Sequence, residues 1–121
     1  MKEVETILEY IEKTIKQTNK KIYGRYIKYY LEEKIFAILY LGNEPHIILK
    51  ANGRFNKEFR KEFKETVYPS YVINQYHWNS IVLNREIPTE VIFKLIDNSI
   101  SEVMDNMTRR QKCIYSYTLK S

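Results

Sequence analysis

Apolar residues recur every three or four positions in three stretches of the chain, and this period predicts three amphipathic helices. The first covers about residues 3–18, the second about residues 56–65, and the third begins at Pro88-Thr89 and reaches Met107. Proline is tolerated in the first turn of a helix, where its missing N–H would have no partner. The predicted apolar faces are Val4, Ile7, Leu8, Ile11 and Ile15; Phe55, Phe59 and Phe63; and Ile92, Phe93, Ile96, Ile100, Val103, Met104 and Met107.

Elsewhere the period shortens to two, which predicts strands. Residues 25–31 alternate, residues 34–41 are apolar at odd and even positions alike, and residues 46–51 form a third strand. Apolar residues on both parities are typical of a central strand that is covered on both faces. A short extended piece over residues 71–74 and a strand over residues 78–84 follow the second helix.

The same alternation predicts which side chains share a face of the sheet. The positions expected to face the core are Ile47, Leu49, Ala51, Ile81 and Leu83, and His77 and Asn79 share the parity of the last two. The opposite face is expected to hold Tyr26, Lys28, Tyr30, His46, Ile48, Lys50, Trp78, Ser80 and Val82.

The order of elements predicts an α+β sandwich, an antiparallel sheet with helices packed on one face and the other face at least partly exposed. A chain of 121 residues fits a single domain over residues 1–121. The tail after about residue 108 is consistent with either a frayed end or an added edge strand.

Charge and composition narrow the functional classes only slightly. The formal net charge is +5, from 20 basic and 15 acidic residues, which permits contact with phosphates without requiring it. No apolar run is long enough for a membrane span, so we expect no membrane partner. The lone Cys113 cannot form an internal disulfide, and we expect a reducing, cytoplasmic setting.

Catalytic and metal-binding patterns do not stand out. Walker, dinucleotide-binding and hydrolase nucleophile motifs are absent, and a lone histidine with no placed acid or nucleophile is not a catalytic signal. Glu5, Glu9 and Glu12 share a face of the first helix, but Lys13 and Lys16 dilute this acidic patch. We therefore expect no enzyme activity, no metal and no cofactor.

Three features are candidates for binding. His77-Trp78-Asn79 is either a surface site with an aromatic platform or a structural element at the start of a strand. Lys57, Arg60, Lys61 and Lys64 lie together on the second helix, either as phosphate contacts or as a solvated face balanced by Glu58, Glu62 and Glu65. The third is the outer sheet surface, where lysines interleaved with aromatic side chains would suit single-stranded nucleic acid, or where tyrosines simply fill strands.

Several short motifs resemble the MmcQ/YjbR family over about residues 34–107. They are Lys34-Ile35-Phe36-Ala37, Leu49-Lys50, Arg60, Pro69, Asn74, His77-Trp78-Asn79, Val82-Leu83, Pro88, Ile96 and Ser99. The chain departs from the family pattern at Gln75-Tyr76, where a lysine is usual, and at residues 20–24. The resemblance implies a CyaY-like (frataxin-like) fold and a DNA-binding role.

The sequence therefore predicts a small non-enzymatic nucleic-acid-binding protein, with DNA a more probable partner than RNA. The contacts are expected from Lys57, Arg60, Lys61 and Lys64, with Lys28, Lys34, Lys50, His77 and Trp78 adding to the surface. The alternative is an adaptor that binds a protein or a small ligand through the tyrosine- and tryptophan-rich sheet face.

Overall fold

The computed structural model describes residues 2–14, 19–51, 53–70, 73–74, 77–83 and 87–106. Its elements are α1 (Lys2–Thr14), β1 (Asn19–Tyr23), β2 (Tyr26–Leu31), β3 (Lys34–Tyr40), β4 (His46–Lys50), α2 (Gly53–Glu62), β5 (Val67–Pro69), β6 (Trp78–Val82) and α3 (Thr89–Asp105). The predicted tail, Met107 and Cys113 lie outside the described residues.

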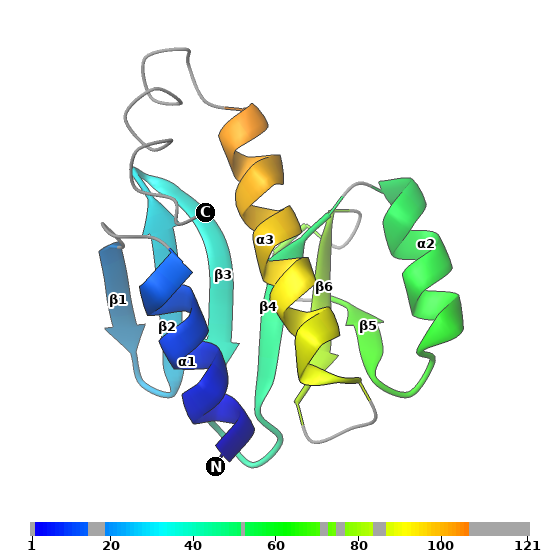
Figure 1. Cartoon of the computed structure of the whole chain (residues 1–121), viewed down its shortest axis with the longest axis horizontal. Helices are drawn as coiled ribbons and strands as arrows, with labels where there is room; N and C mark the ends of the chain where they lie inside the picture. The colour runs from blue at the N-terminus through cyan, green and yellow to red at the C-terminus, as the bar shows by residue number, and fades with distance from the viewer. Residues whose placement is uncertain are drawn as a thin grey trace.

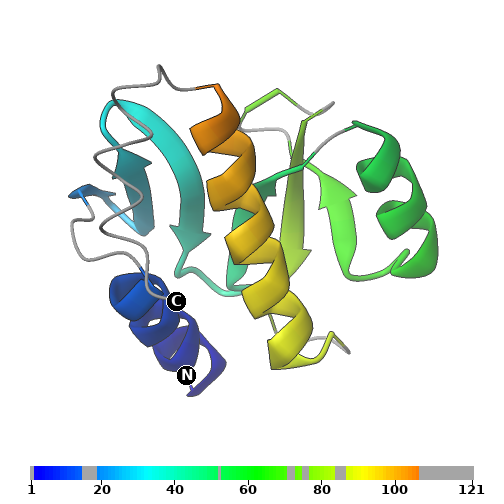
Figure 2. The same ribbon diagram turned by 45° about the horizontal axis from the view of Figure 1, so that its top comes forward.

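The strands form one antiparallel sheet in the order β1-β2-β3-β4-β6-β5. Helices α1 and α3 pack across one face of this sheet, and α2 lies beside its β5 edge (Figure 1). The turned view shows α1 and α3 on the same side of the strands (Figure 2). This confirms the predicted α+β architecture, and we call the face away from α1 and α3 the outer face.

The main core lies between the sheet and the helices. From the sheet it takes Ile27, Tyr29, Leu31, Phe36, Ala37, Leu39, Ile47, Leu49, Val67 and Ile81. From the helices it takes Val4, Ile7, Ile11, Phe59, Ile92, Leu95, Ile96, Ile100 and Val103. The phenylalanine stripe of α2 is confirmed: the ring centroids of Phe55 and Phe59 lie 5.4 Å apart, and those of Phe59 and Phe63 lie 5.0 Å apart.

Helix α1 is fixed to α3 by an aromatic and polar contact. The ring of Tyr10 stacks on that of Phe93 with centroids 4.0 Å apart, and its hydroxyl lies 2.8 Å from both carboxylate oxygens of Asp97. This pair adds a directional contact to the apolar packing of α1 against the core.

The strand register confirms the predicted facing in β4 and β6. Ile47 pairs with Ile81 on the core side, whereas Lys50 pairs with Trp78 on the outer side. In β3 the alternation is broken, because the pairing with β2 shifts between Tyr29 and Tyr30. Because of this bulge, Phe36 and its neighbour Ala37 both face the core, whereas simple alternation would put them on opposite faces.

Two strands were not predicted. β1 was missed because all five of its residues are exposed and give no alternating signal. The other is β5 at Val67–Pro69, and the extended piece expected at residues 71–74 lies partly outside the described residues. Proline ends the helical pattern here but is compatible with an edge strand, where an N–H is not required.

Candidate nucleic-acid interface

The outer face has a small apolar centre of its own. Ile38, Ile48 and Trp78 are buried there, with Tyr26, Ile35 and Ile73 packed against them. Trp78 is only 6% exposed, since it packs with Ile38 and Ile48 and the partly buried Ile73, from before β6, lies against the same cluster. Trp78 is therefore not an open stacking platform, which favours the structural interpretation of this residue.

An aromatic row crosses the outer face beside that centre. It consists of Tyr23, Tyr26, Tyr40 and His46, which are consecutive partners across β1, β2, β3 and β4. The ring centroids of Tyr26 and Tyr40 lie 4.9 Å apart, and so do those of Tyr40 and His46. We call these four residues the aromatic row.

Local turns hold two members of the row in place. The ring of Tyr40 lies against Gly42, where any Cβ would collide with it. Nδ1 of His46 lies 3.1 Å from the carbonyl oxygen of Glu44, which can only accept, so Nδ1 carries the proton in this contact. In that tautomer Nε2 of His46 is left as an acceptor.

Two lysines flank the row on the same face. Nζ of Lys28 lies 5.1 Å from the ring centroid of Tyr23, and Nζ of Lys21 lies 5.3 Å from that of Tyr30. Both distances are within the range of a cation–π contact. None of the strand positions on this face that the structure describes is an aspartate or a glutamate.

Lys34, Lys50 and Trp78 meet at a different place, a hollow of about 530 Å³ where β3 begins and β4 ends. The two strands separate here, and the hydroxyl of Ser99 on α3 bridges them. It donates to the carbonyl oxygen of Phe36 at 2.6 Å and accepts from the backbone N–H of Lys50 at 2.9 Å. The bridge satisfies backbone groups that direct strand pairing would otherwise join.

The other two residues of the His-Trp-Asn motif, His77 and Asn79, make hydrogen bonds within the fold. Nδ2 of Asn79 donates to Oδ1 of Asn56 at 2.6 Å, and Nδ2 of Asn56 donates to the carbonyl oxygen of Ala51 at 3.1 Å. The carbonyl oxygen of His77 accepts from the N–H of Ala51 at 2.8 Å, which extends the β4–β6 pairing. Both asparagines are buried, so this motif joins α2 to the sheet.

Arg60 belongs to the same joint. Its Nε donates to Oδ1 of Asn79 at 2.5 Å, and its terminal NH2 group donates to the carbonyl oxygen of Trp78 at 3.3 Å. The sequence grouped Arg60 with Lys57, Lys61 and Lys64 on one helix face. The structure separates them, because the guanidinium is partly buried and directed at the sheet.

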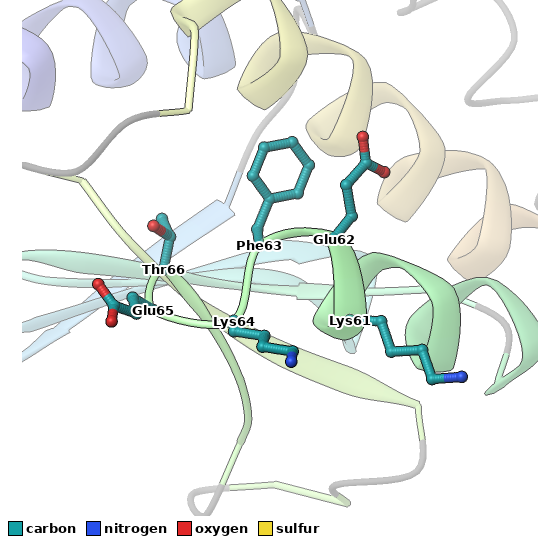
Figure 3. Close-up of a pocket in the computed structure, with 6 residues that line it drawn as sticks. All are labelled: Lys61, Glu62, Phe63, Lys64, Glu65 and Thr66. Carbon is teal, nitrogen blue, oxygen red and sulfur yellow. The ribbon is translucent and has the colours of Figure 1, made fainter.

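The three lysines of the α2 region are exposed, and so are the three nearby glutamates, Glu58, Glu62 and Glu65. A shallow hollow of about 450 Å³ lies along residues 61–66. In Figure 3, Lys61 and Lys64 extend to one side of the chain while Phe63 points away from them. Alternating charges of this kind produce little net field, which matches the solvated-face interpretation.

The nine predicted contact residues thus fall into four places. Lys28 lies beside the aromatic row, Lys34, Lys50 and Trp78 lie at the hollow between β3 and β4, Lys57, Lys61 and Lys64 lie along α2, and Arg60 and His77 lie at the α2–sheet joint. Lys21, Tyr23 and Tyr40 were missed as site residues. Lys21 and Tyr23 lie on β1, which was not predicted. The place of Tyr40 in the row depends on how the strands pair.

The described part of the chain has no group of three or more histidine, cysteine, aspartate or glutamate side chains placed to hold a metal ion. Among the helices that the structure describes, none combines the length and apolar character needed to cross a bilayer.

Comparison with solved structures places the fold. A Deinococcus radiodurans protein, DR2400, is similar with a TM-score of 0.83 and 16% identity, over 93% of this chain and 87% of that one. A Pseudomonas syringae protein is similar with a TM-score of 0.72 and 22% identity, over 82% of this chain and 97% of that one. These likenesses concern the fold alone.

Comparison of sequences places the family. The uncharacterized protein YjbR of Escherichia coli strain K12 is 24% identical over 83 residues, which are 68% of this chain and 70% of that protein. Its counterpart in Escherichia coli O157:H7 matches to the same extent. The YjbR family model matches residues 15–100, most of the chain, and this range includes all six strands of the described sheet. The chain therefore belongs to the YjbR family.

Proposed function

We propose that this chain is a small non-enzymatic nucleic-acid-binding protein that holds a single strand on its outer face. The observation that supports this most directly is the aromatic row with Lys21 and Lys28 beside it. Bases stack on aromatic rings without regard to sequence, and lysines contact the phosphates between them. DNA is the first candidate partner, and a cytoplasmic location and a CyaY-like version of the fold are parts of the same proposal.

The charge distribution favours the outer face over α2. Lys21 and Lys28 have no carboxylate among the described strand positions of their face, whereas the lysines of α2 alternate with glutamates. Double charge reversal can separate the two surfaces, because Lys21→Glu with Lys28→Glu and Lys57→Glu with Lys61→Glu lower the formal net charge of +5 by the same amount. Any difference between these variants then comes from where the charge lies.

The experiment is fluorescence anisotropy of labelled single-stranded and duplex oligonucleotides at low and near-physiological salt. We expect the single strand to bind more tightly, with a linear decrease of log affinity against log salt. The Lys21/Lys28 reversal should weaken binding by about tenfold or more, an effect of about 1.4 kcal/mol. Equal losses in both double variants would show only a response to net charge, and loss confined to the α2 variant would move the interface to α2.

Stacking is tested separately from charge. Tyr23→Ala removes an exposed ring from the aromatic row, and each base–aromatic stack is worth about 1–3 kcal/mol. Tyr68→Ala, on β5 and similarly exposed, is the matched control. If Tyr23→Ala binds as tightly as the wild type, the aromatic row does not contact the bases; a loss in Tyr68→Ala, which faces the same side of the sheet through its pairing with Ser80, would extend the contact beyond the row.

The alternative is a protein-binding adaptor, and one observation favours it. Ile22 on the edge strand β1 is 65% exposed and its neighbour Tyr23 is 51% exposed, as in surfaces that pair with another chain. An adaptor would bind with weak salt dependence. It would lose its partner on Ile22→Lys and would keep it after the Lys21/Lys28 reversal.

A further inference from the structure

The hollow between β3 and β4 is distinct from the aromatic row in shape and in lining. The hollow has a volume of about 530 Å³, a size typical of small-molecule sites, and Lys50 on its rim is next to the Ser99 bridge. One wall is apolar and is formed by Ile35, Ile73 and the edge of Trp78. The rim is polar and is formed by Lys34, Lys50 and Glu33.

We propose that this hollow binds a nucleoside monophosphate group, with the base against the apolar wall and the phosphate between Lys34 and Lys50. A phosphomonoester has a charge of about −1.5 to −2 at neutral pH. The ammonium groups of Lys34 and Lys50 attract that charge, and with Glu33 on the same rim the three side chains have a net formal charge of +1 for the phosphate to neutralise. The apolar side of the hollow, mainly the partly exposed Ile35 and Ile73 with Trp78 beneath them, suits the apolar face of a base, a group that inorganic phosphate lacks.

The remaining lining groups suit the rest of a nucleotide. The carboxylate of Glu33 is an acceptor for the hydroxyl groups of a sugar or the amino group of a base. The C-terminal end of α3, at Val103 and Asn106, closes the other side of the hollow. This end of a helix has partial negative charge, so it also favours donor groups over the phosphate. The phosphate is thereby directed to the lysines.

The group has two possible sources, a free mononucleotide or the phosphorylated end of a nucleic-acid strand. The hollow lies at the ends of β3 and β4, between Ile35 and Trp78 of the outer-face cluster and the C-terminal end of α3, whereas the aromatic row lies on the outer face itself. This inference goes beyond the proposed function, because mononucleotide binding requires neither Lys21 nor Lys28.

Trp78 makes the test direct, because it is the only tryptophan of the chain and it lines the hollow. Its fluorescence is titrated with adenosine monophosphate, with adenosine and with inorganic phosphate. We expect saturable quenching by the monophosphate, and affinities at least about tenfold weaker for the nucleoside and for phosphate alone. No saturable change, or equal affinity for monophosphate and nucleoside, would overturn the proposal.

Charge variants locate the binding. Lys34→Met and Lys50→Met keep the apolar part of the side chain, and the backbone N–H of Lys50 that Ser99 accepts is unchanged. Each should weaken monophosphate binding by about tenfold, whereas Lys94→Met, exposed on α3, should leave it unchanged. Thermal melts check that all three variants fold. Equal affinity in the three variants would show that the hollow is not the site.

Two further measurements separate this inference from the proposed function. The Lys21→Glu with Lys28→Glu variant should keep full mononucleotide binding while it loses oligonucleotide binding. Comparing 5′-phosphorylated with 5′-hydroxyl oligonucleotides identifies the source of the group: a preference for the phosphorylated end that Lys50→Met removes assigns a strand terminus. Equal affinity for both ends, with monophosphate binding intact, assigns a free nucleotide.

Discussion

Asn79 and Asn56 meet by a buried side-chain hydrogen bond of 2.6 Å that joins β6 to α2. Oδ1 of Asn79 accepts from Arg60, and Nδ2 of Asn56 donates to the carbonyl oxygen of Ala51. The network therefore links α2, β6 and the end of β4. Buried polar groups are costly only when a partner is missing, so each member depends on the others.

Replacing Asn79 should destabilise the fold rather than alter binding alone. Asn79→Ala leaves Oδ1 of Asn56 and the guanidinium of Arg60 without this partner, and we expect a loss of about 2–4 kcal/mol in the free energy of unfolding. Urea denaturation followed by circular dichroism measures the loss. Asn43→Ala, exposed in the turn after β3, is the matched control. A cost below about 1 kcal/mol for Asn79→Ala would contradict a structural role for the network.

Ser99→Ala removes the bridge between β3 and β4. The carbonyl oxygen of Phe36 and the N–H of Lys50 would each lose a hydrogen bond, so the expected cost is about 1–3 kcal/mol. Ser101→Ala lies on the same helix and is exposed, so it should change stability by less than about 0.5 kcal/mol. Hydrogen exchange at the amide of Lys50 gives a second measurement. Unchanged protection of that amide in Ser99→Ala would mean that the strands pair directly once the hydroxyl is gone.

Several of the residues behind the family resemblance form these joints. Phe36, Lys50 and Ser99 meet where β3 and β4 separate, and Arg60 and Asn79 meet between α2 and β6. The short motifs are thus explained by the way the helices are fixed to the sheet. The aromatic row, by contrast, contains only Tyr23, Tyr26, Tyr40 and His46, none of which contributed to the resemblance.

The regular helices and strands could be predicted from the sequence, because the spacing of apolar residues indicates which side chains are buried. The facing of Ile47, Lys50, Trp78 and Ile81 follows from alternation alone, and the register confirms it. β1 could not be predicted because every one of its residues is exposed. The bulge at Tyr29 could not be predicted either, since a register shift depends on the partner strand.

The candidate site was predicted less completely, because its residues come from strands that are far apart in the sequence. Tyr26, Lys28 and His46 were placed on one face by their parity. Tyr23 reaches that face only through the pairing of β1 with β2. Trp78 is buried with Ile38 and Ile48, and Ile73, which precedes β6, packs against the same cluster. Contacts set by loops and strand order have no local trace in the sequence.

Tyr29 has a buried hydroxyl with no hydrogen-bond partner within the described part of the chain. Burial, with a smaller contribution from the charge of Glu12, raises the pKa of this phenol to about 12. Tyr29→Phe removes an unsatisfied polar atom and keeps the ring. We expect the variant to equal the wild type at neutral pH or to exceed it by up to about 1–2 kcal/mol.

The same group predicts a dependence on alkaline pH. Because the folded-state pKa lies above the ordinary value of about 10, the unfolded chain releases this proton first as pH rises. Wild-type stability should therefore fall relative to Tyr29→Phe between about pH 10 and pH 12, as denaturant titrations at each pH would show. Tyr30→Phe, on the opposite face of β2, is the matched control. A Tyr29→Phe variant clearly less stable than the wild type at neutral pH would reveal a partner for the hydroxyl.

Gly42 and Gly24 offer a matched pair of glycine substitutions that separate the shape of the aromatic row from general backbone strain. At Gly42 an added Cβ meets the ring of Tyr40, so Gly42→Ala must move that ring away from its present place. At Gly24 nothing lies within 4 Å of an added Cβ, but φ is +58°, so Gly24→Ala costs about 1–2 kcal/mol through the backbone alone. If Tyr40 stacks on a base, Gly42→Ala should weaken oligonucleotide binding by several-fold, about 1 kcal/mol, and Gly24→Ala should retain full affinity despite lower stability. Anisotropy titrations and thermal melts on the same samples measure both quantities. Equal affinity in the two variants would remove Tyr40 from the interface.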